Sequence, residues 1–146
     1  MFIEELYFYY VSLKTEFVDA DTYREWLNKV FVADNNKEDI LLELQFCSDN
    51  MKKTIEEMRI FMYDKQNSID YHAVMKMIIS ELKEQYKDKT ILRQLTEKLY
   101  NIWLMLPENI SSEEPFILLC AIDDPWSWND EEQVEQITEN LIKYYN

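Results

Sequence analysis

The chain contains no glycine in its 146 residues. An average protein of this length has about ten, because glycine makes up about 7% of residues. Without glycine, neither a glycine-rich phosphate-binding loop nor the nucleophile elbow of a hydrolase can be built. Tight hairpin turns also become costly, because only Asn and Asp then tolerate positive φ cheaply. The sequence therefore excludes whole families of nucleotide enzymes and favours helices.

Apolar residues recur every three or four positions along nearly the whole chain, which is the helical period. The segments with this pattern are 2–14, 22–33, 38–47, 51–65, 69–86, 91–106, 113–124 and 130–145, with a break at 34–37. We predict an all-α, compact single-domain bundle of about seven or eight short helices over residues 1–146. One alternative stays open, because the apolar run 116–122 would also suit a buried strand.

Polar residues before these segments predict where the helices begin. The predicted N-caps are Asp21, Ser48 or Asn50, Asn67 or Ser68, Thr90, Ser111 or Ser112, and Asn129. Pro107 is expected to end the preceding helix, because proline cannot continue the hydrogen-bond ladder.

The composition indicates a globular cytoplasmic protein, with 47% hydrophobic and 14% aromatic residues. No apolar run approaches the roughly 20 residues of a membrane span. The N-terminal segment has Glu4 and Glu5 where a signal peptide needs basic residues. Cys47 and Cys120 lie in apolar runs, which favours two buried free thiols over a disulfide.

The net charge of −14 is concentrated at the two ends of the chain. Residues 1–50 carry 4 basic and 11 acidic side chains, and residues 99–146 carry 1 and 10. Residues 51–98 are nearly balanced, with 10 basic and 8 acidic side chains. Nucleic acid and anionic membranes would be repelled by such ends, whereas a basic partner would be attracted.

Catalytic chemistry has little support in the sequence. A Ser-His or Cys-His system would have to use His72, the only histidine, which lies beside an apolar helical stripe. The metal-binding spacings of zinc proteases and di-iron bundles are absent. We therefore predict no enzyme, no metal site and no cofactor.

The stretch "DDPWSWNDEEQVEQ", residues 123–136, is the most distinctive segment. Acids in the first turn of a helix are stabilised by the helix dipole, but Glu135 and Glu139 lie beyond that turn. Together with Glu131 they form a ridge of like charges at i, i+4 and i+8, which costs about 0.2–0.5 kcal/mol per pair. We predict a partner-binding surface made of Asp123, Asp124, Trp126, Trp128, Glu131, Glu135 and Glu139. One tryptophan is expected to be a core anchor, and the other can be exposed.

In size, charge, lack of glycine and this acidic, aromatic segment, the chain resembles bacterial immunity proteins. These are small acidic inhibitors of the toxins of contact-dependent growth inhibition and related polymorphic systems. The resemblance implies stoichiometric binding to a cognate basic toxin domain, often a nuclease, at its active site or at a nearby exosite. From the charge, we predict no direct contact with nucleic acid or membrane.

Other functions remain open. An acidic mimic of nucleic acid needs similar charge but regularly spaced carboxylates, and the balanced middle of the chain disfavours it. A helical adaptor would use the acidic ends only for solubility. An enzyme is disfavoured by the single histidine and the missing glycine.

Overall fold

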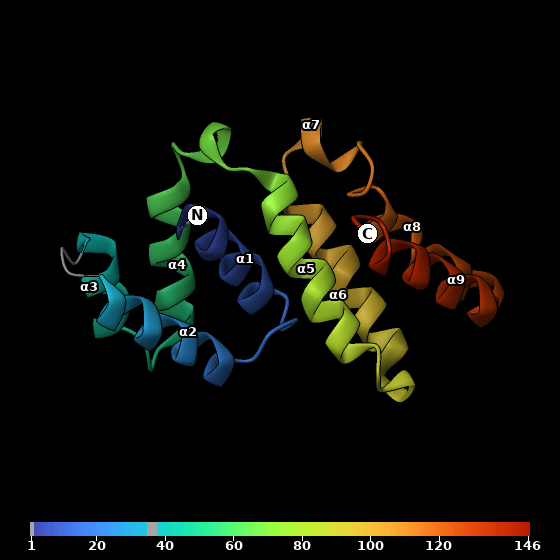
Figure 1. Ribbon diagram of the computed structural model, residues 1–146, viewed down its shortest axis with the longest axis horizontal. Helices are drawn as coiled ribbons and strands as arrows, with labels where there is room; N and C mark the ends of the chain where they lie inside the picture. Colours follow the sequence, from blue (N-terminus) through green and yellow to red (C-terminus); the bar gives the residue numbers. More distant parts are fainter. Residues whose placement is uncertain (1, 35–37) are drawn as a thin grey trace. The chain divides into compact units, whose positions relative to one another are not determined.

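The computed structural model describes residues 2–34 and 38–146, and its regular elements there are all helical (Figure 1). The all-α prediction is confirmed, with nine α-helices in the described residues rather than seven or eight. The additional helix arises because Pro107 is followed at once by a short helix, α7 (Glu108–Ser111). The run 116–122 forms the short helix α8 (Leu118–Ala121) with helical flanks, so the strand alternative is wrong. Most of the predicted break at 34–37 lies outside the described residues.

Close Cα neighbours divide the chain into two compact units, Met1–Ile69 and Asp70–Asn146. Each unit is helical throughout its regular elements in the described residues. The single-domain assignment stays a prediction.

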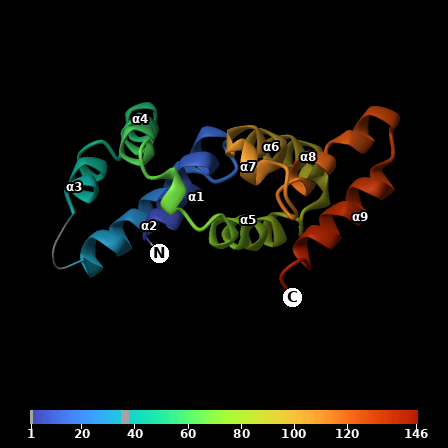
Figure 2. The same cartoon turned by 90° about the horizontal axis from the view of Figure 1, so that it is seen from above.

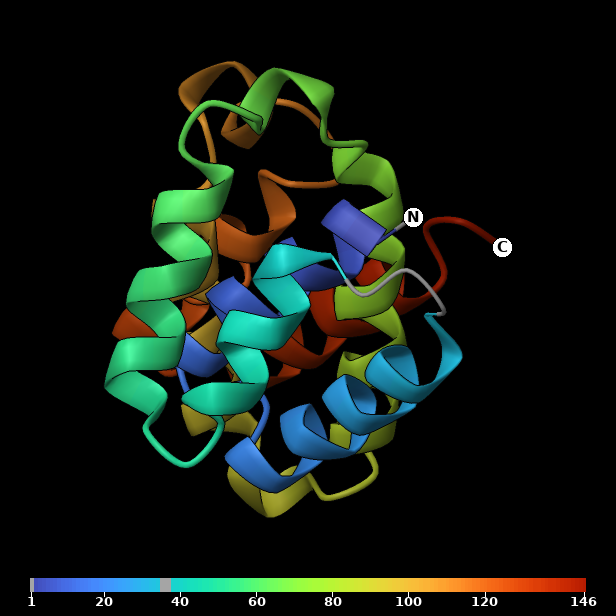
Figure 3. The same cartoon turned by 90° about the vertical axis from the view of Figure 1, so that its left-hand side faces the viewer.

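The first unit is built around α1 (Phe2–Lys14), which packs along α4 (Met51–Met62). Helix α2 (Ala20–Ala33) packs on α1 and on α3 (Asp39–Phe46), which in turn lies beside α4 (Figure 3). These helices bury the apolar positions that the period predicts. The buried side chains of the first unit include Leu6, Val11, Phe17, Tyr23, Leu27, Ile40, Leu44 and Met58.

The second unit contains α5 (Tyr71–Gln85), α6 (Leu92–Met105) and α9 (Glu131–Ile142). Helix α6 packs on α8, and α5 packs on α9. A 3₁₀ turn, η3 (Asp124–Trp128), contacts both α8 and α9 and leads directly into α9 (Figure 2). The buried side chains of this unit include Val74, Ile78, Leu82, Leu95, Leu99, Ile102, Val134 and Leu141.

Several predicted helix starts are wrong by a few residues. Aspartates cap instead, because their carboxylates accept backbone N–H groups two or three positions ahead. The observed caps are Asp19 in place of Asp21, Asp70 in place of Asn67 or Ser68, and Asp130 in place of Asn129. The predicted cap Thr90 is also wrong, because Asp88 caps the 3₁₀ turn η2 (Lys89–Ile91) that precedes α6, and no side chain caps α6 itself. Asn50 caps α4 as predicted, and α6 ends before Pro107. Ser111 and Ser112 follow α7 and cap no helix through their side chains.

Two residues with a side chain take the left-handed conformation that glycine would otherwise fill. Glu16, just after α1, has φ of 62°, and Asn129, just after η3, has φ of 57°. Both positions end a helical segment, where a left-handed residue commonly terminates the hydrogen-bond ladder. Because the chain has no glycine, residues with a Cβ atom take this conformation at these two helix ends, and the backbone there is locally strained.

The two cysteines are both free thiols. Cys47 is buried as predicted, whereas Cys120 is only half-buried, so the prediction of two buried thiols is wrong for Cys120. Burial still raises the pKa of the Cys120 thiol, and the nearby carboxylates of Asp124 and Asp123 raise it further. Its thiolate is thereby disfavoured.

Candidate functional site

The predicted acidic and aromatic residues occupy one part of the second unit. Asp123 follows α8, Asp124 and both tryptophans lie in η3, and Glu131 begins α9. Because η3 packs against α9, the turn and the first residues of that helix are neighbours. Asn129 makes this arrangement possible, since its left-handed backbone lets the chain reverse between the two elements.

Trp126 is the anchor of the turn. Its indole N–H donates a 2.7 Å hydrogen bond to the hydroxyl of Thr96 on α6, whose side chain is 0% exposed. The guanidinium of Arg93 lies 5.2 Å from the centre of the indole ring. Trp126 is therefore half-buried against α6, and its ring position is fixed by a specific acceptor.

Trp128 is the exposed tryptophan of the pair, with 57% of its surface accessible. The acids near it in the chain, Asp124 and Glu131, are exposed as well. An exposed tryptophan offers a large contact area, which is the property of an interface hot spot. Its acidic neighbours would favour a partner with positive charge.

A hollow of about 450 Å³ opens beside Trp126. It is lined by residues from α6 and from the turn, including Arg93, Glu97, Tyr100, Asn101, Asp123 and Trp126. Sequence reasoning missed the α6 members of this set. Their spacing was the available signal, because Arg93, Glu97 and Tyr100 stand at i, i+4 and i+7 and so share one helix face.

The carboxyl group of Asp123 is the most perturbed acid of this hollow. Its pKa is raised, first by burial and then by the negative charges of Glu97 and Asp124. The guanidinium of Arg93 and a hydrogen bond with the Thr96 side chain lower the pKa of Asp123 without cancelling these effects. The hollow therefore holds more negative charge than its single arginine neutralises.

The predicted ridge on α9 is divided between two environments. Glu131 and Glu139 are exposed and Glu135 is half-buried. In residues 2–34 and 38–146, no ion pair involves these three carboxylates. Glu139 nevertheless lines a separate hollow of about 320 Å³. That hollow also contains Lys83, Lys87, Lys89 and Lys143. Only the N-terminal part of the ridge thus adjoins the turn with Trp128.

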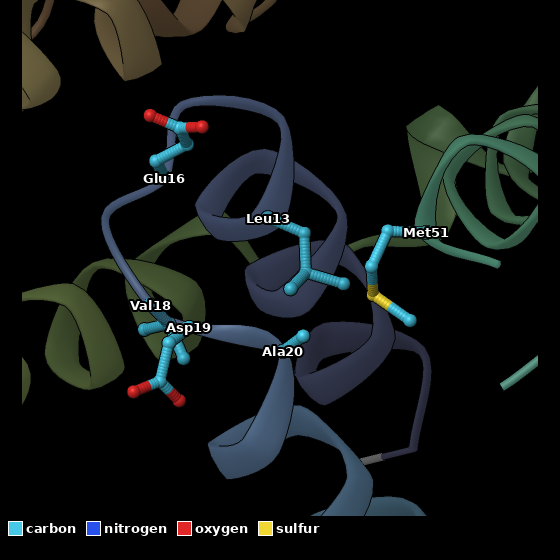
Figure 4. Close-up of a pocket in the computed structure, with 6 residues that line it drawn as sticks. All are labelled: Leu13, Glu16, Val18, Asp19, Ala20 and Met51. Carbon is cyan, nitrogen blue, oxygen red and sulfur yellow. The ribbon is translucent and has the colours of Figure 1, made fainter. Parts of the chain in front are cut away.

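The first unit has a pocket of about 330 Å³ near the end of α1. Leu13 and Met51 give it apolar walls, and Figure 4 shows the carboxylates of Glu16 and Asp19 directed away from these two side chains. The Asp19 carboxylate is already engaged, because it accepts a 2.8 Å hydrogen bond from the backbone N–H of Thr22.

His72 is held in structural contacts. Its Nδ1 lies 2.6 Å from the Tyr145 hydroxyl, and its ring packs edge-on against Phe116. The carboxylate of Asp70 accepts hydrogen bonds from the backbone N–H groups of His72 and Ala73. These contacts hold the imidazole between Tyr145 and Phe116.

Two further features concern only the part of the chain that the structure describes. There, no three His, Cys, Asp or Glu side chains gather as a metal site. No helix in the same residues has the length and apolar character needed to cross a bilayer.

Comparisons with protein-family models, with curated protein sequences and with solved structures gave no match to this chain.

Proposed function

We propose that this chain is an immunity protein that binds a cognate basic toxin domain, such as a nuclease, and neutralises it. The single observation that carries the proposal is Trp128, which is 57% exposed on a turn with exposed acids, Asp124 and Glu131, near it in the chain. From residue 99 to residue 142 the chain carries ten acids and no lysine or arginine. The exposed Trp128 thus lies in the most acidic part of the chain.

Charge and shape have separate roles in this proposal. The acidic stretch would attract a basic domain over long range and speed the encounter, an effect that salt screens. Trp128 would then supply the short-range contact that slows dissociation. A nuclease surface is suitable for such binding, because it must be basic to hold the phosphate backbone of its substrate.

A second function, mimicry of nucleic acid, has less support. The carboxylates of the α9 ridge do not form a continuous row, because Glu135 is half-buried and Glu139 lies among lysines. A helical adaptor without a charged target would also use Trp128 for binding, but it would leave the exposed acids Asp124 and Glu131 without a role in recognition.

The test is a protection experiment in bacteria. We expect a large secreted toxin to be encoded beside the gene of this chain. The chain is co-expressed with the C-terminal domain of that toxin, and survival is compared with cells that lack the chain. We expect full protection, and a 1:1 complex by size-exclusion chromatography with light scattering. Growth arrest in the presence of well-expressed, folded chain would contradict the proposal.

Two sets of variants distinguish this proposal from the adaptor. In the first, Asp124 and Glu131 are replaced by Asn and Gln, which removes charge and preserves shape. In the matched control, the exposed Glu108 and Glu113 are both replaced by Gln. We expect the first set to slow association with the toxin several-fold at low salt, and the control to change it much less. Equal effects of the two sets would show that only net charge matters.

A further inference from the structure

The hollow between α6 and η3 has walls of three chemical kinds. Trp126 and Tyr100 contribute aromatic rings, Glu97 and Asp123 contribute carboxylates, and Asn101 contributes an amide. The one cation in the lining, Arg93, already lies over the ring of Trp126 at 5.2 Å. A guanidinium is therefore compatible with this aromatic surface.

We propose that this hollow receives an arginine side chain of the protein partner. The inference rests on the proposed function, because it names the chemistry by which that partner is recognised. The planar guanidinium would stack on an aromatic ring and donate hydrogen bonds to Asp123 and Glu97, which lie at different points of the wall. At about 450 Å³ the hollow is large enough to admit a side chain.

Charge balance favours a cation over an anion. Two carboxylates in the lining face one guanidinium, and Asp124 adds a third negative charge close to Asp123. Arg93 makes no ion pair within the described residues. Asp123 has a hydrogen bond with the Thr96 side chain, but a carboxylate has about four acceptor sites, so Asp123 can accept further hydrogen bonds. Entry of a cation would relieve the repulsion between the carboxylates, whereas entry of a carboxylate would increase it.

Arginine suits these walls better than lysine. Its guanidinium has five N–H donors in one plane and stacks on aromatic faces, so it can contact rings and carboxylates together. A lysine ammonium is a compact, strongly hydrated charge, and it would lose hydration on entering a hollow with aromatic walls. We therefore expect discrimination between the two side chains as well as a requirement for positive charge.

The experiment uses the full chain and four capped tripeptides, acetyl-Gly-X-Gly-amide, with X as arginine, citrulline, lysine or glutamate. Binding is followed by two-dimensional NMR through the indole N–H of Trp126. We expect saturable shifts with the arginine peptide, weaker ones with lysine, and none with citrulline, which is neutral and nearly isosteric, or with glutamate. Replacing Asp123 by Asn or Glu97 by Gln should weaken arginine binding about tenfold. Glu113→Gln, an exposed acid outside the hollow, should leave it unchanged.

The possible outcomes separate this inference from the proposed function. Equal shifts with arginine and citrulline, a preference for glutamate, or loss of binding in Glu113→Gln would overturn the arginine site, even if toxin protection holds. Selective arginine binding without toxin protection would support the hollow and refute the immunity function.

Discussion

Trp126 donates its indole N–H to the hydroxyl of Thr96 at 2.7 Å, across thirty residues of sequence. The Thr96 hydroxyl itself donates to the backbone carbonyl of Arg93 on the same helix. A single buried threonine thus joins η3 to α6 and sets the position of one wall of the hollow. The two tryptophans of the turn have different roles because only Trp126 has this acceptor.

Replacing Thr96 by Val should lower the free energy of unfolding by about 1–2 kcal/mol, because the indole N–H of Trp126 loses its acceptor and Asp123 loses a hydrogen-bond partner while shape is preserved. The matched control is Thr138→Val. Thr138 is equally buried and also donates to a carbonyl of its own helix, but no indole donates to it. Urea denaturation should show the larger loss for Thr96. Equal losses for both variants would mean that the indole bond contributes nothing measurable.

Replacing Glu16 by Gly should stabilise the protein by about 1 kcal/mol, because glycine adopts positive φ without the steric cost of a Cβ atom. Asn129→Gly should gain only a few tenths of a kcal/mol, since asparagine tolerates this region. Thermal and urea denaturation measure the change in the free energy of unfolding for both variants. Glu16→Ala is the control, and it should bring no gain because alanine keeps the Cβ atom. A loss of stability in Glu16→Gly would show that the Glu16 side chain contributes more than its backbone conformation costs.

The helices could be predicted because the apolar period is a local property of the sequence. The segment 2–14 corresponds to α1, and 91–106 contains all of α6. The caps were less predictable, because several acids and hydroxyls precede each helix and only the final backbone path selects among them. Asp19 and Asp21 are two residues apart, and both carry the favoured side chain.

The hollow could not be predicted from sequence, because its walls come from segments about thirty residues apart. Glu97 and Tyr100 on α6 meet Asp123 and Trp126 only after α8 has packed on α6. The pattern around residues 123–136 did indicate an acidic, aromatic surface. It could not show which tryptophan was exposed, because that depends on the position of Thr96.

Asp123→Asn should slightly raise stability at neutral pH. The pKa of the Asp123 carboxyl is raised by burial and by Glu97 and Asp124, so folding disfavours its ionised form. The carboxylate therefore lowers stability as pH rises through this raised pKa, and the cost is absent in acid, where the group is protonated in both states. After solvent screening we expect a gain of about a few tenths of a kcal/mol. Urea denaturation at neutral and at acid pH measures this gain in the free energy of unfolding. A gain that persists in acid would show that it does not come from the ionised carboxylate.

Tyr145 should ionise late in alkali. Burial and the negative charges of Tyr144 and Asp70 raise its pKa to about 12, above the ordinary 10.0. Because the unfolded chain ionises first, the contribution of Tyr145 to stability is complete below pH 10 and is lost as pH rises toward 12. Phenolate absorbance in the wild type minus Tyr145→Phe isolates this titration. Asp70→Asn keeps a good helix cap but removes a charge, so it should lower the pKa. A midpoint near 10 in the wild type would contradict the prediction.

Trp128→Ala should separate binding from folding. The side chain is 57% exposed, so its loss should change stability by less than about 0.5 kcal/mol. If Trp128 anchors the toxin domain, its removal should cost about 2 kcal/mol or more of binding free energy, mainly through faster dissociation. Phe46→Ala is the control, because Phe46 is an aromatic side chain that is 88% exposed, on α3 of the first unit. Surface plasmon resonance with the toxin domain measures both variants. If Trp128→Ala and Phe46→Ala lost similar amounts of binding free energy, the interface would not be centred on the turn.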